Sequence, residues 1–210
     1  MKDGYTTLKD IGEASFTEKK SEFIGSAMPV QTEEEALEFI AEIKKKHSTA
    51  RHNVYAYVVR ENNIIRFTED GEPKGTAGSM VLEVLKKSDI TDAVIVVTRY
   101  FGGILLGTGG LARAYTKAAS DAINAAGIAV MKNLTEFKIT CSFRDHDRIK
   151  HTLQSFKYNL DNTDFSANVT LYCSAVHDVY ESIKKTVTEL TADRASIEVT
   201  GERFGADGVS

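Results

Sequence analysis

The alternation of apolar and polar positions in the last third of the chain predicts a small α+β unit. Residues 136–143 alternate as a half-buried strand does, whereas residues 145–156 and 177–190 repeat apolar positions at helical spacing. Asp145 is placed to cap the first of these helices. The predicted elements are strand 136–143, helix 145–156, two strands within 158–176, helix 177–190 and strand 195–202. This β-α-β-β-α-β order is that of a ferredoxin-like domain.

The first 130 residues carry a less regular pattern that also predicts strands and helices. Thr32 and Glu35 form a capping box at the start of an amphipathic helix. Leu37, Ile40 and Ile43 are predicted to form the buried face of that helix. The predicted elements are strand 21–30, a helix within 31–48, strands 53–59, 63–68 and 92–100, and helices 77–87 and 109–126.

These elements predict an α+β protein of two domains, since 210 residues suffice for two cores of modest size. The break falls near residues 131–134. It separates an N-terminal domain over residues 1–131 from a ferredoxin-like domain over residues 132–203. Residues 204–210 are glycine-rich and polar, and we expect them to form a frayed tail.

Composition narrows the class of protein. The chain is 42% hydrophobic and 27% charged, and it has no apolar run near the roughly 20 residues that span a bilayer. The N-terminus lacks an apolar export segment, and Cys141 and Cys173 are too few for a disulfide framework, so we predict a cytoplasmic protein. The net charge of −4 gives no overall basic field, so any contact with nucleic acid requires a local basic patch.

Two glycine clusters, at residues 71–78 and 102–110, each precede a predicted helix. Glycine lets backbone N–H groups approach an anion, and a helix N-terminus adds a partial positive charge. Neither cluster matches the P-loop, and the segment from Gly107 matches the dinucleotide fingerprint only loosely. Phosphate binding and simple tight turns are therefore both open interpretations of these glycines.

Arg99 and Arg113 flank the second cluster, with Tyr100 and Tyr115 beside them. Guanidinium groups pair with phosphates and aromatic rings stack on bases, so this mixture suits single-stranded RNA or a nucleotide. In the alternative interpretation, an arginine pairs with one of three nearby acids, which are Glu69, Asp70 and Glu72. The candidate binding residues are Lys74, Gly75, Thr76, Arg99, Tyr100, Gly102, Gly103, Gly107, Gly109, Gly110, Arg113 and Tyr115.

Four polar residues, His52, Asn53, Asp70 and Glu72, are candidates for a supporting role. Asp70 and Glu72 could hold Mg²⁺ or act as acid and base, but a turn uses the same residues without chemistry. No hydrolase elbow and no zinc-ligand spacing occurs in the chain. We therefore assign no catalytic residue, no metal site and no cofactor.

The N-terminal domain resembles the IMPACT family. The resemblance rests on four segments: SEFIG at 21–25, HNVYAY at 52–57, DGEPKGTAGSMVL at 70–82 and VVTRYFGGILLGTGGLARAY at 96–115. It implies a domain like the second domain of ribosomal protein S5, followed by a ferredoxin-like domain. That pair is similar to consecutive domains of elongation factor G. Eukaryotic members regulate translation through an additional N-terminal domain, which the resemblance does not extend to this chain.

The function expected from the resemblance is translation-associated regulation, without an established reaction. Joined to the arginine and tyrosine motif, it predicts a protein that binds RNA or the ribosome, with protein partners in the translation apparatus and no membrane. The alternative is a small-molecule enzyme, or a protein that binds a nucleotide or phosphate at the two glycine-rich helix entries. The S5-like fold also hosts small-molecule kinases, but a likeness of fold alone does not establish an activity.

Overall fold

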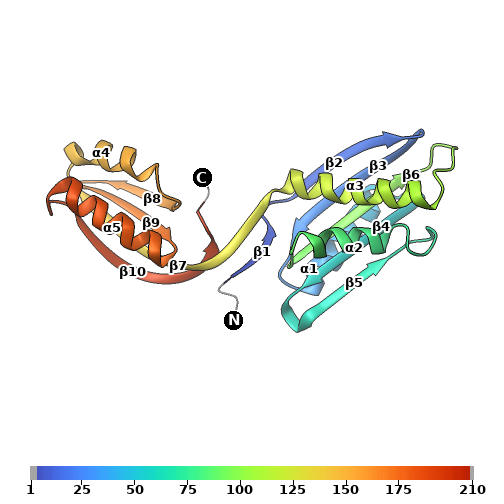
Figure 1. The fold of residues 1–210 in the computed structure, drawn as a ribbon, viewed down its shortest axis with the longest axis horizontal. Helices are drawn as coiled ribbons and strands as arrows, with labels where there is room; N and C mark the ends of the chain where they lie inside the picture. Colours follow the sequence, from blue (N-terminus) through green and yellow to red (C-terminus); the bar gives the residue numbers. More distant parts are fainter. Residues whose placement is uncertain (1–3, 209–210) are drawn as a thin grey trace. The chain divides into compact units, whose positions relative to one another are not determined.

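The computed structural model describes residues 4–208, which fold into two compact units (Figure 1). One unit is Thr6–Ala129, and the other runs from Val130 onward and includes the N-terminal residues up to Tyr5. Each unit combines a 5-stranded sheet with α-helices, which confirms the predicted α+β class. The division lies inside strand β7 (Ile128–Cys141), slightly before the break predicted at 131–134.

The sheet of the N-terminal unit is antiparallel and has the strand order β2-β3-β6-β4-β5. Its central strand, β6, is buried on both faces: Ile95 and Val97 pack with α2 and α3, whereas Val94 and Val96 pack with α1. This explains the nearly continuous apolar sequence of β6. The elements are β2 (Gly12–Glu18), β3 (Ser21–Pro29), α1 (Glu33–Lys46), β4 (His52–Val59), a 3₁₀ turn (Glu61–Asn63), β5 (Ile64–Thr68), α2 (Gly78–Lys87), β6 (Ala93–Tyr100) and α3 (Thr108–Ala126).

Helix α1 begins at the predicted capping box. The Thr32 hydroxyl oxygen accepts a hydrogen bond from the Glu35 amide, and the Glu35 carboxylate accepts one from the amide of Gln31. The prediction that Leu37 is buried is wrong, because its side chain is 48% exposed. The buried residues of α1 are three or four positions apart and so share one face of the helix: Ala36, Phe39, Ile40 and Ile43. Leu37 lies at the edge of this face.

The C-terminal unit has the predicted β-α-β-β-α-β order. Its antiparallel strands lie in the order β8-β9-β7-β10, and helices α4 and α5 share one core with the sheet. Strand β1 (Gly4–Leu8), which the sequence pattern did not reveal, also pairs with β7. Ser142 caps α4 in place of Asp145, which lies one turn inside the helix. The remaining elements are α4 (Phe143–Leu153), β8 (Asn159–Phe165), β9 (Val169–Ala175), α5 (His177–Thr191) and β10 (Ser196–Ala206).

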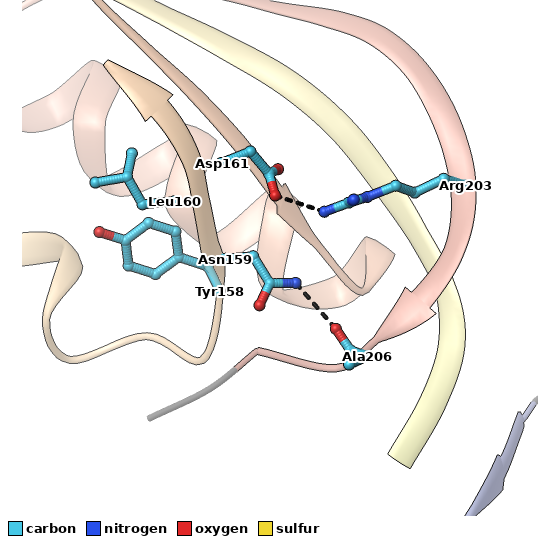
Figure 2. A pocket seen from close by; sticks show the side chains of 6 residues that line it. All are labelled: Tyr158, Asn159, Leu160, Asp161, Arg203 and Ala206. Atoms are coloured by element: carbon cyan, nitrogen blue, oxygen red, sulfur yellow. Dashed lines mark hydrogen bonds and ion pairs between the residues drawn. The ribbon is translucent and has the colours of Figure 1, made fainter. Parts of the chain in front are cut away.

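The frayed tail predicted at 204–210 is corrected by strand β10, which pairs with β7 as far as Ala206. Figure 2 shows how this end is held: the Asn159 amide donates to the Ala206 carbonyl, and Arg203 reaches Asp161 on β8. Asp207 accepts hydrogen bonds from Lys132 and Lys157. Backbone pairing with β7 and the hydrogen bonds of the Asp207 carboxylate thus order this segment as far as residue 208. Residues 209–210 lie outside the described part of the chain.

Candidate functional site

The antiparallel register of the N-terminal sheet brings three sequence-distant segments to one end. Phe23 at the start of β3 and His52 at the start of β4 are both in register with Arg99 at the end of β6. Figure 1 shows the β2–β3 turn, the β5–α2 loop and the β6–α3 loop at this same end of the unit. We call it the loop end, and it comprises residues 18–21, 51–53, 69–77 and 99–113.

A buried carboxylate organises the interior of the loop end. Oε1 of Glu72 accepts hydrogen bonds from Arg99 Nη1 at 2.6 Å and from the Tyr115 hydroxyl at 2.8 Å. The ring atom Nε2 of His52 lies 3.8 Å from the same oxygen. Burial, followed by the charge of Glu72, holds the pKa of Tyr115 well above its usual range, so this hydroxyl remains a donor. The β5–α2 loop is thereby fixed to β6 and α3.

Arg99 and Tyr115, two of the candidate binding residues, lie in the interior of the unit. Arg99 is 4% exposed and Tyr115 is 0% exposed, so neither side chain is available to RNA on the surface. The guanidinium of Arg99 also lies over the rings of Phe23 and Phe101, with 5.5 Å to each ring centre. Of the two interpretations of Arg99, the ion pair with Glu72 is the one observed.

Tyr100 and Thr76, two further candidate binding residues, have hydroxyl groups that contact other residues of the unit. Successive strand residues point to opposite faces, so Tyr100 points away from Arg99 and its hydroxyl lies 3.0 Å from Nδ1 of His47 at the end of α1. Thr76 is buried, and its hydroxyl donates to the Pro73 carbonyl within the β5–α2 loop. Both residues stabilise local structure.

Polar side chains determine the path of the β5–α2 loop. The Asp70 carboxylate accepts a hydrogen bond from the backbone N–H of Asn53. The side-chain oxygen of Asn53 accepts one from the Thr98 hydroxyl. Nδ1 of His52 lies 2.7 Å from the Asp70 carbonyl; because a carbonyl only accepts, this nitrogen carries the proton. The four predicted supporting residues thus come together with Arg99, as a scaffold for the loop.

Glu69 is a structural residue that the sequence identified only as an alternative partner for an arginine. Its carboxylate accepts hydrogen bonds from the amides of Gly75, Ala77, Gly78 and Ser79, which cap α2 from outside the helix. Burial alone would raise the pKa of Glu69, but the backbone donors outweigh it and hold the pKa below its usual range. The signal in the sequence was the absence of a capping side chain before Gly78.

Glu69→Gln is expected to lower the free energy of unfolding at neutral pH by about 1–2 kcal/mol, because the amide loses the negative charge at the helix start. The depressed pKa means that this stabilisation is complete above the unfolded-state pKa of about 4. It is lost as the pH falls through the lower folded-state pKa. Urea unfolding of both proteins between neutral and acidic pH should therefore converge on the acid side. A difference that stays constant would contradict the role given to the charge, and Glu83→Gln on the exposed face of α2 is the control.

The predicted glycines differ in what they do. A Cβ on Gly102 would overlap the backbone of Lys20 and Ser21, so this position requires glycine for close packing against the β2–β3 turn. Gly75, Gly103 and Gly107 adopt positive φ in open space. Gly109 and Gly110 lie in the first turn of α3. Only the last three of these positions, 107, 109 and 110, belong to the start of that helix.

A cleft of about 410 Å³ opens at the loop end beside the buried network. Its wall includes the start of α3, where Gly107 offers no capping side chain and the first helical hydrogen bond runs from the Leu111 amide to the Gly107 carbonyl. The amides that precede Leu111 in α3 have no acceptor within the helix. The cleft is lined by Arg51, His52, Gly71, Glu72, Pro73, Arg99, Phe101, Leu105, Leu106, Gly107, Thr108 and Leu111.

Five exposed cations lie at the loop end. These cations are Lys19, Lys20, Arg51, Lys74 and Arg113. None of them forms an ion pair or a side-chain hydrogen bond with another residue of the range 4–208. Arg51 lines the cleft, Lys74 follows Pro73 in its wall, and Nη1 of Arg113 lies 3.6 Å from where a Cβ on Gly109 would stand. Together with buried Arg99, these cations outnumber the four carboxylates of the loop end, those of Glu18, Glu69, Asp70 and Glu72, so the loop end has a small net positive charge on an acidic protein.

Residues 4–208 contain no group of three or more His, Cys, Asp or Glu side chains that could hold a metal ion. Over the same residues, no helix has both the length and the apolar character needed to cross a bilayer.

Comparisons with known proteins match both units. The Impact N-terminal domain matches residues 19–123, and a domain of unknown function, DUF1949, matches residues 139–194. The chain is 40% identical over 199 residues to IMPACT family member YvyE of Bacillus subtilis, which covers 94% of this chain and 92% of that protein. It is 35% identical over 156 residues to IMPACT family member YigZ of Escherichia coli, which covers 73% and 76%.

More distant similarities agree. Protein IMPACT of Rattus norvegicus is 32% identical over 98 residues, a match that covers 45% of this chain and 31% of the rat protein. A crystal structure of a hypothetical protein is 26% identical and covers 96% of this chain and 99% of its own, with a TM-score of 0.59. From the identity to its bacterial relatives and the share of each chain aligned, we conclude that this chain belongs to the IMPACT family.

Proposed function

We propose that this IMPACT-family chain is a translation-associated regulatory protein that binds single-stranded RNA at the loop end. The observation that carries the proposal is the set of exposed, unpaired cations at the loop end. A strand of RNA is neutralised by such cations, whereas an acidic protein without a local patch repels it. The translation-related role of eukaryotic family members supports the choice of RNA over DNA.

The arrangement of the loop end supports a particular mode of binding. Arg113, Lys74 and the free amides at the start of α3 would receive phosphate groups. The ring of Phe101 is 39% exposed, and the Arg51 guanidinium lies 5.8 Å from its centre, which suits one unstacked base. Arg99 contributes indirectly, because it fixes the ring of Phe101 and the loop that carries Lys74.

The test is a triple variant, Arg51→Ala, Lys74→Ala and Arg113→Ala. We expect its affinity for single-stranded RNA to fall roughly tenfold or more and by the same factor for different sequences, because phosphate contacts carry no sequence information. Fluorescence anisotropy at moderate salt measures this, and co-sedimentation with ribosomes extends it to the physiological target.

The matched control removes three exposed lysines, Lys9, Lys86 and Lys87, which lie near the opposite ends of α3 and α2. This control changes the net charge by the same amount and should retain RNA affinity within about twofold. Equal losses in both triple variants would indicate a general charge effect and would contradict a site at the loop end.

The concave shape of the cleft favours a second candidate function, the binding of a nucleotide or another small phosphate-bearing ligand. A thermal-shift screen of nucleotides with and without Mg²⁺ tests it. A ligand at 100 times its Kd stabilises the folded protein by about 2.7 kcal/mol, which is a readily measured shift. If no nucleotide shifts the transition while RNA binds, the first candidate is retained and the second is rejected.

A further inference from the structure

The C-terminal unit exposes two phenylalanines side by side, far in sequence from the loop end. Phe143 at the start of α4 is 56% exposed, and Phe165 at the end of β8 is 60% exposed. Their rings are stacked with centres 6.5 Å apart, and the ring of His146 meets Phe165 edge-on at 5.7 Å. Neither phenylalanine belongs to the hydrophobic core of the unit. Pairs of exposed rings that do not contribute to folding are typical of binding surfaces.

A polar cleft of about 550 Å³ adjoins this aromatic pair. Ser142 and Arg144, the sequence neighbours of Phe143, line it together with Asn168, which follows Phe165 in the β8–β9 turn. The remaining lining residues are Thr140, Cys141, Asp145, Arg194 and Ser196. Hydroxyl, amide and guanidinium groups are the side chains that read the edges of unstacked bases.

The second cleft on this unit, shown in Figure 2, differs in one respect. Its charged groups are bound to each other: Arg203 contacts Asp161 at 2.6 Å, and the Asn159 amide is engaged by the Ala206 carbonyl. At the aromatic pair, in contrast, Arg144 and Arg148 are exposed and have no ion-pair partner within residues 4–208. Of these two clefts, the one lined by Arg144 therefore has an exposed guanidinium without an ion-pair partner among residues 4–208.

The charges at the aromatic pair nearly cancel. Exposed Arg194 donates to buried Asp145 and holds the pKa of that carboxyl below its usual range, so this pair is neutral overall. The free guanidiniums of Arg144 and Arg148 are offset by exposed Asp147 and Asp164. Stacking, rather than attraction of phosphate, is then the main source of affinity, and binding depends little on salt.

We propose that Phe143 and Phe165, with the adjoining polar cleft, form a second site for single-stranded RNA, at which bases stack and their edges meet Arg144 and Asn168. The site is independent of the loop end. It differs also from the uncovered face of the same sheet, where Lys138 and Arg203 are paired with acids and Tyr172 is the exposed aromatic residue.

The experiment compares the full chain with its Phe143→Ala/Phe165→Ala variant, both in the background of the loop-end triple variant. The probe is a fluorescent single-stranded oligoadenylate of about 12 nucleotides. We expect the alanine substitutions to weaken binding by roughly fivefold or more, because each stacked base contributes about 1–3 kcal/mol. Residual binding before the substitution should vary little with salt. If the loop-end proposal fails, the loop-end triple variant binds RNA no more weakly than its matched control, and the comparison of the phenylalanine variant with its parent still decides the present proposal.

Two further variants exclude a loss of folding as the cause. Phe143→Trp/Phe165→Trp should restore or increase affinity, since tryptophan also stacks on bases. Tyr172→Ala removes an aromatic ring that is 39% exposed on the other face and should have no effect. Equal affinity of the alanine variant and its parent would overturn the proposal, as would a loss of binding in Tyr172→Ala alone. Retained thermal stability of all variants is required, and the exposure of both phenylalanines predicts it.

Discussion

Arg99→Ala is expected to lower the free energy of unfolding of the N-terminal unit by about 3–5 kcal/mol. The substitution leaves the Glu72 carboxylate, whose side chain is 4% exposed, without its positive partner. Tyr115 remains as a donor to the same oxygen, but it carries no charge. Burying an uncompensated carboxylate is costly, and the vacated space beside Phe23 adds to the loss. Urea unfolding followed by circular dichroism at neutral pH measures the effect.

Arg113→Ala is the matched control for this prediction. Arg113 lies in the same sequence motif, is exposed and has no partner in the described residues, so its removal should change stability by less than about 0.5 kcal/mol. For RNA affinity, we expect the opposite ranking among folded variants. Arg113→Ala lowers the affinity directly, whereas Arg99→Ala acts only through the loop that Arg99 fixes. Stability of Arg99→Ala equal to that of the unchanged chain would mean that the Glu72 ion pair does not hold the loop end together.

Gly102→Ala is expected to destabilise the N-terminal unit by about 1–3 kcal/mol or more, since its Cβ would overlap the backbone of Lys20 and Ser21. The β6–α3 loop would have to move away from the β2–β3 turn and lose the hydrogen bond from the Gly102 amide to the Ser21 hydroxyl. Thermal unfolding detects this as a lower midpoint of the transition.

Gly109→Ala should instead stabilise the N-terminal unit. A Cβ at this position meets only Nη1 of Arg113, at an ordinary 3.6 Å, and alanine favours a helix over glycine by up to about 1 kcal/mol. The two substitutions thus separate glycines required by packing from glycines that leave a helix start open. If both proteins lost stability equally, the crowding argued for Gly102 would not be its cause.

The sequence pattern predicted most helices and strands because the buried apolar positions of each one follow a pattern within its own short segment of sequence. Helices α4 and α5 and the strands between them have apolar positions at regular spacing, and β6 is nearly continuously apolar. Strands β1 and β2 were missed because their segments, GYTTL and GEASFTE, contain few large apolar residues. They are stabilised by neighbours that are distant in sequence, such as Lys117 of α3, whose ammonium group lies over the ring of Phe16 in β2. The tail was missed for the same reason, because the partner of β10 is β7.

The candidate site was predicted in part. Its two glycine-rich helix entries do lie at one end of the sheet, and Lys74 and Arg113 are among the exposed cations. The motif could not distinguish Arg113 from Arg99, because the burial of Arg99 follows from the register of β3, β4 and β6. Lys19, Lys20 and Arg51 were missed, since only tertiary structure brings the β2–β3 turn and the start of β4 to the glycine loop.

The central claim is that cations of the loop end contact RNA phosphates, and the salt dependence of binding tests it most directly. Each phosphate contact on a single strand contributes about 0.7 to the slope of log affinity against log salt. The triple variant that lacks Arg51, Lys74 and Arg113 loses the two phosphate contacts assigned to Lys74 and Arg113 and should therefore show a slope smaller in magnitude by about 1.4, whereas the Lys9, Lys86 and Lys87 control keeps the original slope. Identical slopes for the three proteins would contradict the account.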